Sequence, residues 1–415
     1  MSTLETISKN IQDLLDSRKI SIAELSNYLG VSRQTMTNYL KNTSVIDSVQ
    51  LAKVAHFFNV DISQLYSNSN NADSKMIFRT ALNYNVAQTE INETVMNAIE
   101  KYNSIADSVN IDTCYFPEQY NLSVNYEGKK IDINYECQDY FDYKLKIDTE
   151  LKNNIIKIAN EQRALLGLGN AGAINLIPAL TKRGINLLFL DMTNDDISGL
   201  SICDELKGCY IVVNSKQNIE RQLFTLAHEY AHIILHRPLY KRRIMQNFTT
   251  KKKCFLDYMA DCFAGYLLCP EYMISEFQYS ITESKNNLQA LCNLLIPIKL
   301  NMNVSLSALM MSLRNYGYIS SHTLNEYFNI LTLNGKRKYE PCSISENQVL
   351  RNYFFVERDK SITNMIHKYY SIFNDATNTK EWLGYFTNLS EHDIELLIKK
   401  WSEIQDERFM EMFEN

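Results

Sequence analysis

The stretch FTLAHEYAHIILHR, residues 224–237, places two histidines four residues apart, with a glutamate directly after the first. On an α-helix, positions i and i+4 lie one turn apart on nearly the same face. The imidazoles of His228 and His232 can therefore bind one cation, and Glu229 lies close enough to take a proton from water on that cation. A zinc ion lowers the pKa of such a water to about 7, so this pattern predicts a Zn²⁺ site that does chemistry.

The same helix is apolar nearly all round, which is typical of a buried helix. We expect it to span 219–236 and to end at Arg237, because Pro238 disfavours helical backbone in the residue before it. An ordinary core helix with satisfied histidines is the alternative interpretation. Buried polar groups without partners cost several kcal/mol, however, and one metal ion satisfies both imidazoles and the carboxylate together. We therefore favour the metal site, with Glu229 as its catalytic base.

A third protein ligand is expected from the next helix, at about 254–268. Asp257 and Asp261 are four residues apart and share a face of that helix. Asp257 is the predicted ligand, and Asp261 is predicted to accept a proton from a ligand imidazole and so fix its tautomer. Two alternatives stay open: the two aspartates are solvated surface acids, or Cys254 is the third ligand. His236 is predicted to be structural, because the helix would have to bend to bring it to the same ion.

Residues 21–40, SIAELSNYLGVSRQTMTNYL, have the pattern of a helix–turn–helix. Ser21 and Ser32 can cap the two helices, and Gly30 with Val31 can form the turn. The exposed face of the second helix would then present the predicted DNA-contacting residues Arg33, Gln34, Thr35 and Asn38.

Charge limits how such a unit binds double-stranded DNA. The segment 1–66 holds six basic and six acidic residues, so its net charge is zero. Phosphate neutralisation supplies most of the affinity for DNA, so a single copy should bind weakly, and we expect a homodimer on a palindromic operator. The alternative is a small helical module that binds other proteins.

The chain as a whole is predicted to be multidomain and mainly α, with an α+β core. The polar run 67–73 suits a linker, and 74–149 is a connecting region without an assigned role. In 150–320, the β-rich runs INLLFLD and CYIVVN flank a turn-rich NDDISG and predict a small sheet among helices. Residues 321–415 are predicted to be helical. The part 346–415 has a net charge of −5 (8 − 13) and holds both tryptophans, so it is either a helical domain with its own core or a docking surface.

Composition excludes several classes of protein. The net charge of −6 excludes a nucleic-acid polycation, and no apolar run reaches the roughly 18 residues of a membrane span. The N-terminus is polar, and the nine cysteines form no CxxC pair, so we expect a cytoplasmic protein with reduced thiols and no membrane contact. The stretch 237–253 carries seven basic and no acidic residues. It is either a solvated loop or a flank of the metal cleft that attracts an acidic peptide or nucleic acid.

Two resemblances accompany these patterns. RQLFTLAHEYAHIILHR, followed by DYMADCFAGYLLCP, resembles the ImmA/IrrE family of zinc metallopeptidases over roughly 150–320. The segment 1–66 resembles the lambda-repressor/Xre-type DNA-binding domain. The first resemblance implies a zincin-like fold in which two histidines and the glutamate of an ExxA(D/N) motif bind zinc, with the HExxH glutamate as general base.

Each motif residue of the family corresponds to one position of this sequence. His228, His232 and Glu229 occupy the positions of the two ligands and the base. The third ligand falls on Asp257, where the family usually has glutamate, and the pair Tyr230-Ala231 replaces the usual Leu-Gly. An aspartate is one methylene shorter, so either its helix sits closer to the ion or the metal is held less tightly.

The resemblance also implies a biological role, a regulator whose peptidase domain cuts a repressor protein in response to stress or prophage induction. The DNA-binding segment and the peptidase-like core lie in one chain here. We therefore expect the substrate to be a repressor that is met on DNA, or this chain itself. Two alternatives stay open: a transcription regulator whose metal domain only senses or stabilises, and a phage-defence or toxin–antitoxin component. Tyr258, Tyr240 and Arg221 are candidates for the donor that stabilises the oxyanion.

Overall fold

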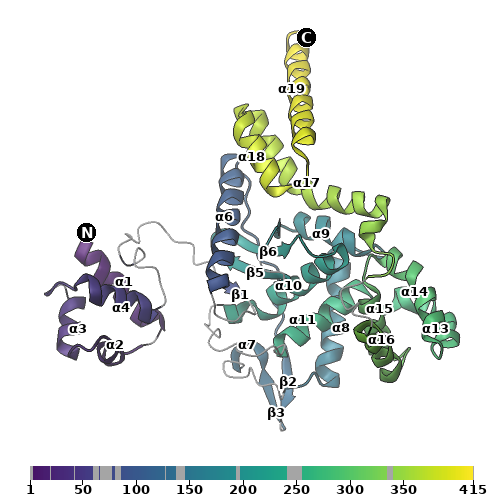
Figure 1. Cartoon of the computed structure of the whole chain (residues 1–415), viewed down its shortest axis with the longest axis horizontal. Coiled ribbons are helices and arrows are strands. Elements are labelled where there is room, and N and C mark those ends of the chain that lie inside the picture. The colour runs from purple at the N-terminus through teal and green to yellow at the C-terminus, as the bar shows by residue number, and fades with distance from the viewer. Residues whose placement is uncertain are drawn as a thin grey trace. The chain divides into compact units, whose positions relative to one another are not determined.

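A computed structural model describes residues 3–18, 20–41, 43–58, 65, 77–79, 86–126, 128–136, 145–192, 197–240, 255–333 and 340–414. The chain divides into two compact units, Met1–Lys75 and Met76–Asn415 (Figure 1). Both units are rich in helix, and the second also contains a small sheet, so the predicted mainly α architecture with an α+β core is confirmed. The finer domain boundaries at 66, 73, 149 and 320 stay predictions.

The first unit is a bundle of short helices, α1 (Thr3–Arg18), α2 (Ile22–Leu29), α3 (Arg33–Leu40) and α4 (Ser48–Phe58). The side-chain oxygens of two serines cap the middle helices, as the sequence predicted: Ser21 accepts from the N–H of Glu24, and Ser32 accepts from the N–H of Thr35. Gly30 ends α2 in the left-handed region, at φ 70°, where glycine is the favoured residue. The helices enclose one apolar core that includes Ile11, Leu25, Leu29, Met36 and Phe58.

The second unit is built on a four-stranded sheet in the order β1 (Ile77–Arg79), β5 (Gly199–Asp204), β6 (Gly208–Asn214), β4 (Asn186–Leu190). β5 runs antiparallel to both of its neighbours, and β4 runs parallel to β6. The sequence predicted β4 and β6 but not β5. Nearly every residue of β5 is buried, so the strand lacks the alternation of polar and apolar residues that marks a half-buried strand.

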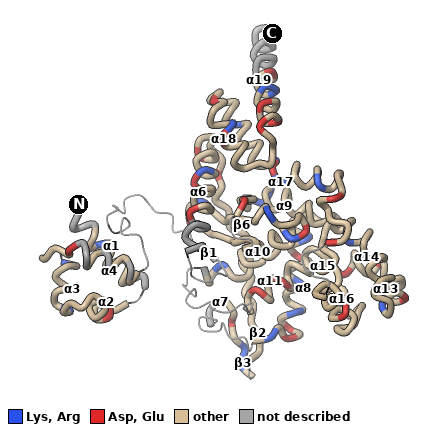
Figure 2. Tube along the Cα trace, in the orientation of Figure 1, with Lys and Arg blue, Asp and Glu red and all other residues tan. Residues whose placement is uncertain are grey.

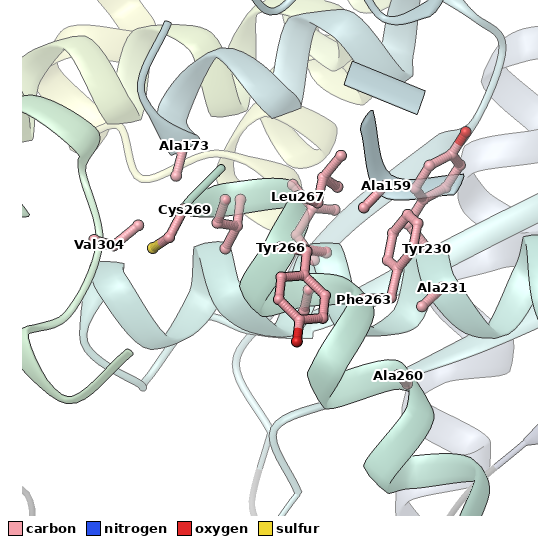
Figure 3. Close-up of a cluster of buried hydrophobic side chains, with 14 of the residues drawn as sticks. Ala159, Ala173, Tyr230, Ala231, Ala260, Phe263, Tyr266, Leu267, Cys269 and Val304 are labelled. Carbon is pink, nitrogen blue, oxygen red and sulfur yellow. The ribbon is translucent and has the colours of Figure 1, made fainter. Parts of the chain in front are cut away.

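One face of the sheet carries the long helix α10 (Ile219–Tyr240), which packs on β5 and β6. α11 (Phe255–Leu268) packs along α10, and α8 (Thr149–Leu165) packs against α11. Their apolar side chains belong to the largest core cluster among the described residues, part of which is drawn in Figure 3. α10 and α11 are thereby held side by side, which sets the spacing of the polar residues on them.

The prediction that this helix ends at Arg237 is wrong, because α10 continues through Pro238 to Tyr240. Proline lacks the N–H that would bond to the carbonyl of Ile234 one turn earlier. That carbonyl instead accepts hydrogen bonds from the N–H of Tyr120 at 2.9 Å and from Nε2 of Gln119 at 2.7 Å. A neighbouring segment of chain thus replaces the lost bond, and the helix can tolerate the proline.

The other face of the sheet carries α6 (Val86–Ser108) and the C-terminal helices α17 (Gln348–Phe373) and α18 (Ala376–Phe386), and α19 (Glu391–Glu414) packs on α17 and α18. Successive residues of a strand point to opposite faces. Accordingly, Leu200 and Ile202 of β5 join this second cluster, which also contains Trp401 of α19. The prediction of a C-terminal domain with its own core is therefore wrong: these helices complete the core of the sheet.

The outer surface of the C-terminal helices is charged. Acidic and basic residues are interspersed along α17, α18 and α19 (Figure 2). Lys380 illustrates this surface, because its Nζ lies 2.8 Å from Glu395 and 3.0 Å from Glu391, both exposed. The same helices also expose apolar side chains, among them Val356 at 60% and Ile372 at 55%, so a docking surface here stays a prediction.

The remaining elements connect and buttress these layers. They are the hairpin β2 (Ser123–Tyr126) and β3 (Lys129–Asp132), and α7 (Ile133–Glu136), η1 (Ala173–Asn175), α9 (Leu176–Lys182), α12 (Glu271–Ser275), α13 (Gln278–Ser284), α14 (Leu288–Met302), α15 (Leu306–Tyr316), α16 (Ser321–Leu333) and η2 (Ile344–Glu346). Taken singly, no helix in the described part of the chain is long and apolar enough to cross a membrane. The bent pair α14 and α15 reaches that length and composition jointly, and its side chains Leu295 and Leu309 are buried in the main core.

Candidate metal centre

Three potential metal ligands converge where α10 and α11 pack together. His228 and His232 come from α10 and Asp257 from α11, and one ligand atom of each lies within 4.8 Å of the others. The two Nε2 atoms are 3.0 Å apart, and Oδ1 of Asp257 lies 3.6 Å from Nε2 of His232. His232 and Asp257 are buried. Helical spacing places the imidazoles on one face, and helix packing brings the carboxylate to them.

The second ring nitrogen of each histidine is also held. Nδ1 of His228 lies 2.9 Å from Oδ1 of Asp261, and Nδ1 of His232 lies 2.8 Å from Nδ1 of His236. A proton on each ligand Nδ1 suits both contacts, because a carboxylate and an imidazole nitrogen can each accept it. In that tautomer both Nε2 lone pairs face the point where the three side chains meet. Hydrogen-bond partners of this kind orient metal-binding histidines and raise their basicity.

Glu229 lies between the two histidines in sequence and is 7% exposed. Its Oε2 accepts a hydrogen bond from Oγ of Ser201 at 2.8 Å. Ser201 is fully buried on β5, on the face that α10 covers. The strand thus holds the glutamate side chain while the helix holds the histidines. Sequence analysis missed Ser201, and the signal that could have found it is a serine among the apolar residues of GLSICD, residues 199–204.

The donor set suits zinc. Two imidazole nitrogens and a carboxylate oxygen are the protein ligands of many catalytic zinc sites, which leave the fourth position for water or substrate. The shorter aspartate requires α11 to lie close to α10. Both helices bury small side chains in the shared core, including Ala231 of α10 and Ala260 of α11 (Figure 3), and small residues permit close packing of helices.

Tyr230 follows Glu229 but points to a different partner. Its hydroxyl donates to Oε1 of Gln162 at 2.5 Å, and Nε2 of Gln162 donates to the hydroxyl of Tyr120 at 2.9 Å. Burial raises the pKa of Tyr230 well above its ordinary value, so the phenol stays protonated and remains a donor. This chain of hydrogen bonds ties α10 to α8, and it explains how a tyrosine is accommodated in the buried helix.

The other residues singled out in the sequence take different positions. Nη2 of Arg221 donates to Oγ of Ser198 at 2.9 Å, and Tyr258 is 53% exposed. The side chain of Tyr240, Cys254 and the basic stretch from residue 241 to 253 lie outside the described residues. Among the candidates for an oxyanion donor, the structure therefore gives Arg221 and Tyr258 other surroundings and leaves their role a prediction.

The predicted DNA-contacting residues lie together on α3. Arg33 and Gln34 are exposed, and Thr35 and Asn38 are half-buried, whereas Met36 on the same helix is buried. Nε2 of Gln34 donates to Oδ1 of Asn38 at 3.2 Å, so these two amides lie side by side.

Comparison with known families matches two parts of the chain. Residues 10–68 match the Cro/C1-type helix–turn–helix DNA-binding domain, and residues 180–309 match the IrrE N-terminal-like domain. No curated protein and no solved structure matches the chain. The second matched range includes all three candidate ligands and Glu229. The chain therefore joins a DNA-binding head to a metallopeptidase-like domain, as the two resemblances implied.

Proposed function

We propose that this chain is a DNA-binding regulator whose central domain is a zinc-dependent endopeptidase that cleaves a regulatory protein in the cytoplasm. The substrate is a repressor or the chain itself, and cleavage answers a stress or prophage signal. One observation carries the proposal: the ligand atoms of His228, His232 and Asp257 lie within 4.8 Å of one another. Glu229 follows the first ligand directly and is held by Ser201.

The chemistry follows from the roles of these side chains. His228, His232 and Asp257 would hold the ion, which when bound supplies Lewis-acid polarisation of water and of a peptide carbonyl. Asp261 and His236 orient the two imidazoles through their Nδ1 atoms. Glu229 takes a proton from the attacking water and returns it to the leaving amine. Ser201 keeps the carboxylate in place throughout.

We propose that the helix–turn–helix unit brings this activity to operator DNA. The exposed face of α3 would enter the major groove, with Gln34 and Asn38 reading base edges and Arg33 and Thr35 reaching bases or phosphates. Because the segment 1–66 has no net charge, we propose that two copies bind together.

Two substitutions test whether both activities exist and are separable. Glu229→Gln should lower the rate of proteolysis by about 10²–10⁴-fold, because the general base is lost, and should leave zinc content and DNA binding unchanged. Asn38→Ala should weaken binding to a duplex selected from a random pool and leave proteolysis unchanged. Cleavage products are followed by mass spectrometry of the purified chain with candidate repressors. Equal proteolysis by the Glu229→Gln variant and the parent contradicts the endopeptidase.

A second candidate function is a regulator whose metal domain senses or stabilises without hydrolysis. The observation that favours it is Asp257, which stands where the family usually has glutamate. In that case Glu229→Gln leaves the regulatory phenotype intact, whereas His232→Ala, which removes a ligand, abolishes it.

A further inference from the structure

We propose that β1 is a substrate-like strand: residues 77–79 occupy the edge of β5 on which an extended peptide substrate of this site would bind. This assignment rests on the proposed peptidase function and deepens it. It names the surface that holds the peptide and the segment of the same chain that competes for it.

The sheet topology defines that surface. β1 lies at the edge of the sheet, and β5 separates it from β6 (Figure 1). β1 runs antiparallel to β5, with Phe78 opposite Ile202 and Arg79 opposite Ser201. Without β1, β5 is itself an edge strand. The outward N–H and C=O groups of an edge strand are a template for any peptide that can add as a further strand.

The same edge passes close to the proposed base. Ser201 lies directly opposite Arg79 in the ladder, and its Oγ donates to Glu229. Paired strands lie about 4.8 Å apart, so the backbone of β1 runs one strand spacing from the residue that holds Glu229. α10, which carries the histidines, lies next to β5 and also next to β1. A peptide added to β5 in this register is therefore presented to the metal-binding helix.

β1 can occupy the edge of β5 reversibly. It has three residues and forms few ladder hydrogen bonds, and such short strand pairs are weak by themselves. Because it belongs to the same chain, it nevertheless competes at a high effective concentration against a separate peptide. A substrate must therefore displace β1 before it reaches the site.

The position of β1 in the chain gives this competition a consequence. Unit 1, which contains the helix–turn–helix, ends at Lys75, and β1 is the first described element of unit 2. Displacement of β1 therefore frees the first described residues that follow unit 1 in the sequence.

A binding experiment tests the assignment without requiring hydrolysis. The full chain carries Glu229→Gln in every case, and the probe is fluorescein-labelled SKMIFRTALN, the sequence of residues 74–83. Phe78→Pro and Arg79→Pro are added separately. Neighbouring residues of an antiparallel strand direct their N–H groups alternately toward and away from the partner, so one of the two prolines removes a bond to β5. In that variant, fluorescence anisotropy should show at least about tenfold tighter binding of the probe than in the Glu229→Gln parent.

Lys130→Pro is the matched control, because Lys130 lies in β3, a strand of the separate β2–β3 hairpin. This variant should bind the probe as the parent does, and a scrambled peptide should bind none of the variants. The proposal is overturned if neither proline in β1 raises the affinity, or if Lys130→Pro raises it equally.

A reversible disulfide gives a second test, which does not depend on how proline affects folding. Phe78→Cys with Ile202→Cys places two thiols directly opposite in the ladder, where a disulfide can form. The oxidised form should not bind the probe, and reduction of the same sample should restore the parental affinity. Unchanged probe binding in the locked form overturns the proposal. Since every readout is binding, this outcome is distinguishable from a failure of the peptidase function.

Discussion

Two buried polar clusters lie on the same helix, α10, and they differ in what faces their carboxylates. At the start of the helix, Glu220 lies 3.6 Å from Nζ of Lys299, which is itself 2.7 Å from Oε1 of Glu340. The N–H of Ile344 also donates to Glu220, at 2.6 Å. In this cluster the chain supplies its own positive charge, from a lysine that is fully buried.

In the middle of α10, imidazoles face the carboxylates. Asp261 lies against His228, and Asp257 lies against His232. An imidazole is charged only when protonated, and its neutral form keeps one lone pair that can bind a metal. The comparison teaches that burial of charge alone does not mark a functional site. A cluster completed by a lysine is structural, whereas one completed by paired imidazole lone pairs is suited to receive a cation.

The largest effect on stability is expected at the lysine. Lys299→Met leaves Glu220 and Glu340 buried without their cation, and removing one partner of a buried ion pair costs about 3–5 kcal/mol. Urea unfolding, followed by the fluorescence of the two tryptophans in unit 2, should show this loss. Lys101→Met is the matched control: its partner Glu381 is exposed, so its loss should stay below about 1 kcal/mol. Equal losses in both variants would mean that the buried lysine is not a structural counter-ion.

A smaller effect is expected at the support of the first histidine. Asp261→Asn keeps an oxygen beside Nδ1 of His228 but removes the negative charge, so zinc affinity should fall about 10–100-fold. Competition with a chromogenic chelator measures this change, and the melting temperature of the metal-stripped protein should stay close to that of the parent. Asp257→Asn, which alters a proposed ligand, should lower the affinity further. A parental affinity in the Asp261→Asn variant would contradict the assigned role of Asp261.

The smallest effect is expected at Glu340. Burial raises the pKa of this carboxyl group above its ordinary value. The folded protein therefore holds this proton more tightly than the unfolded chain. This tighter proton binding adds to the free energy of unfolding at low pH. The contribution is lost as the pH rises through the raised pKa. Glu340→Gln removes this loss and leaves Lys299 with Glu220. The variant should gain stability relative to the parent as pH rises from about 5 to about 7, as urea unfolding at both pH values would show. No relative gain over this range would contradict the shift.

What the sequence predicted about the site depends on local geometry. The i, i+4 spacing places His228 beside His232, and it places Asp257 and Asp261 on one face, whatever the rest of the chain does. The contact of Ser201 with Glu229 instead joins a strand to a helix 28 residues away, and it depends on a strand that carries no alternating pattern. No periodicity in the sequence predicts such a contact.

The same distinction between local and long-range contacts explains which features of the fold were predicted from the sequence. Ser21 and Ser32 cap helices through residues three positions away, and they were predicted. The continuation of α10 through Pro238 depends on Gln119 and Tyr120, more than a hundred residues earlier, and it was not predicted. Likewise, the C-terminal region was predicted to be helical, but which surface its helices cover is decided by the sheet.

The separate cores of the two units have an evolutionary consequence. Every described core residue of the helix–turn–helix unit falls between Ile7 and Leu65, and those of the sheet-containing unit begin at Val95. The described core of each unit is therefore built from that unit's own residues. Natural selection can therefore exchange one helix–turn–helix unit for another and leave the packing of the metallopeptidase-like domain unchanged.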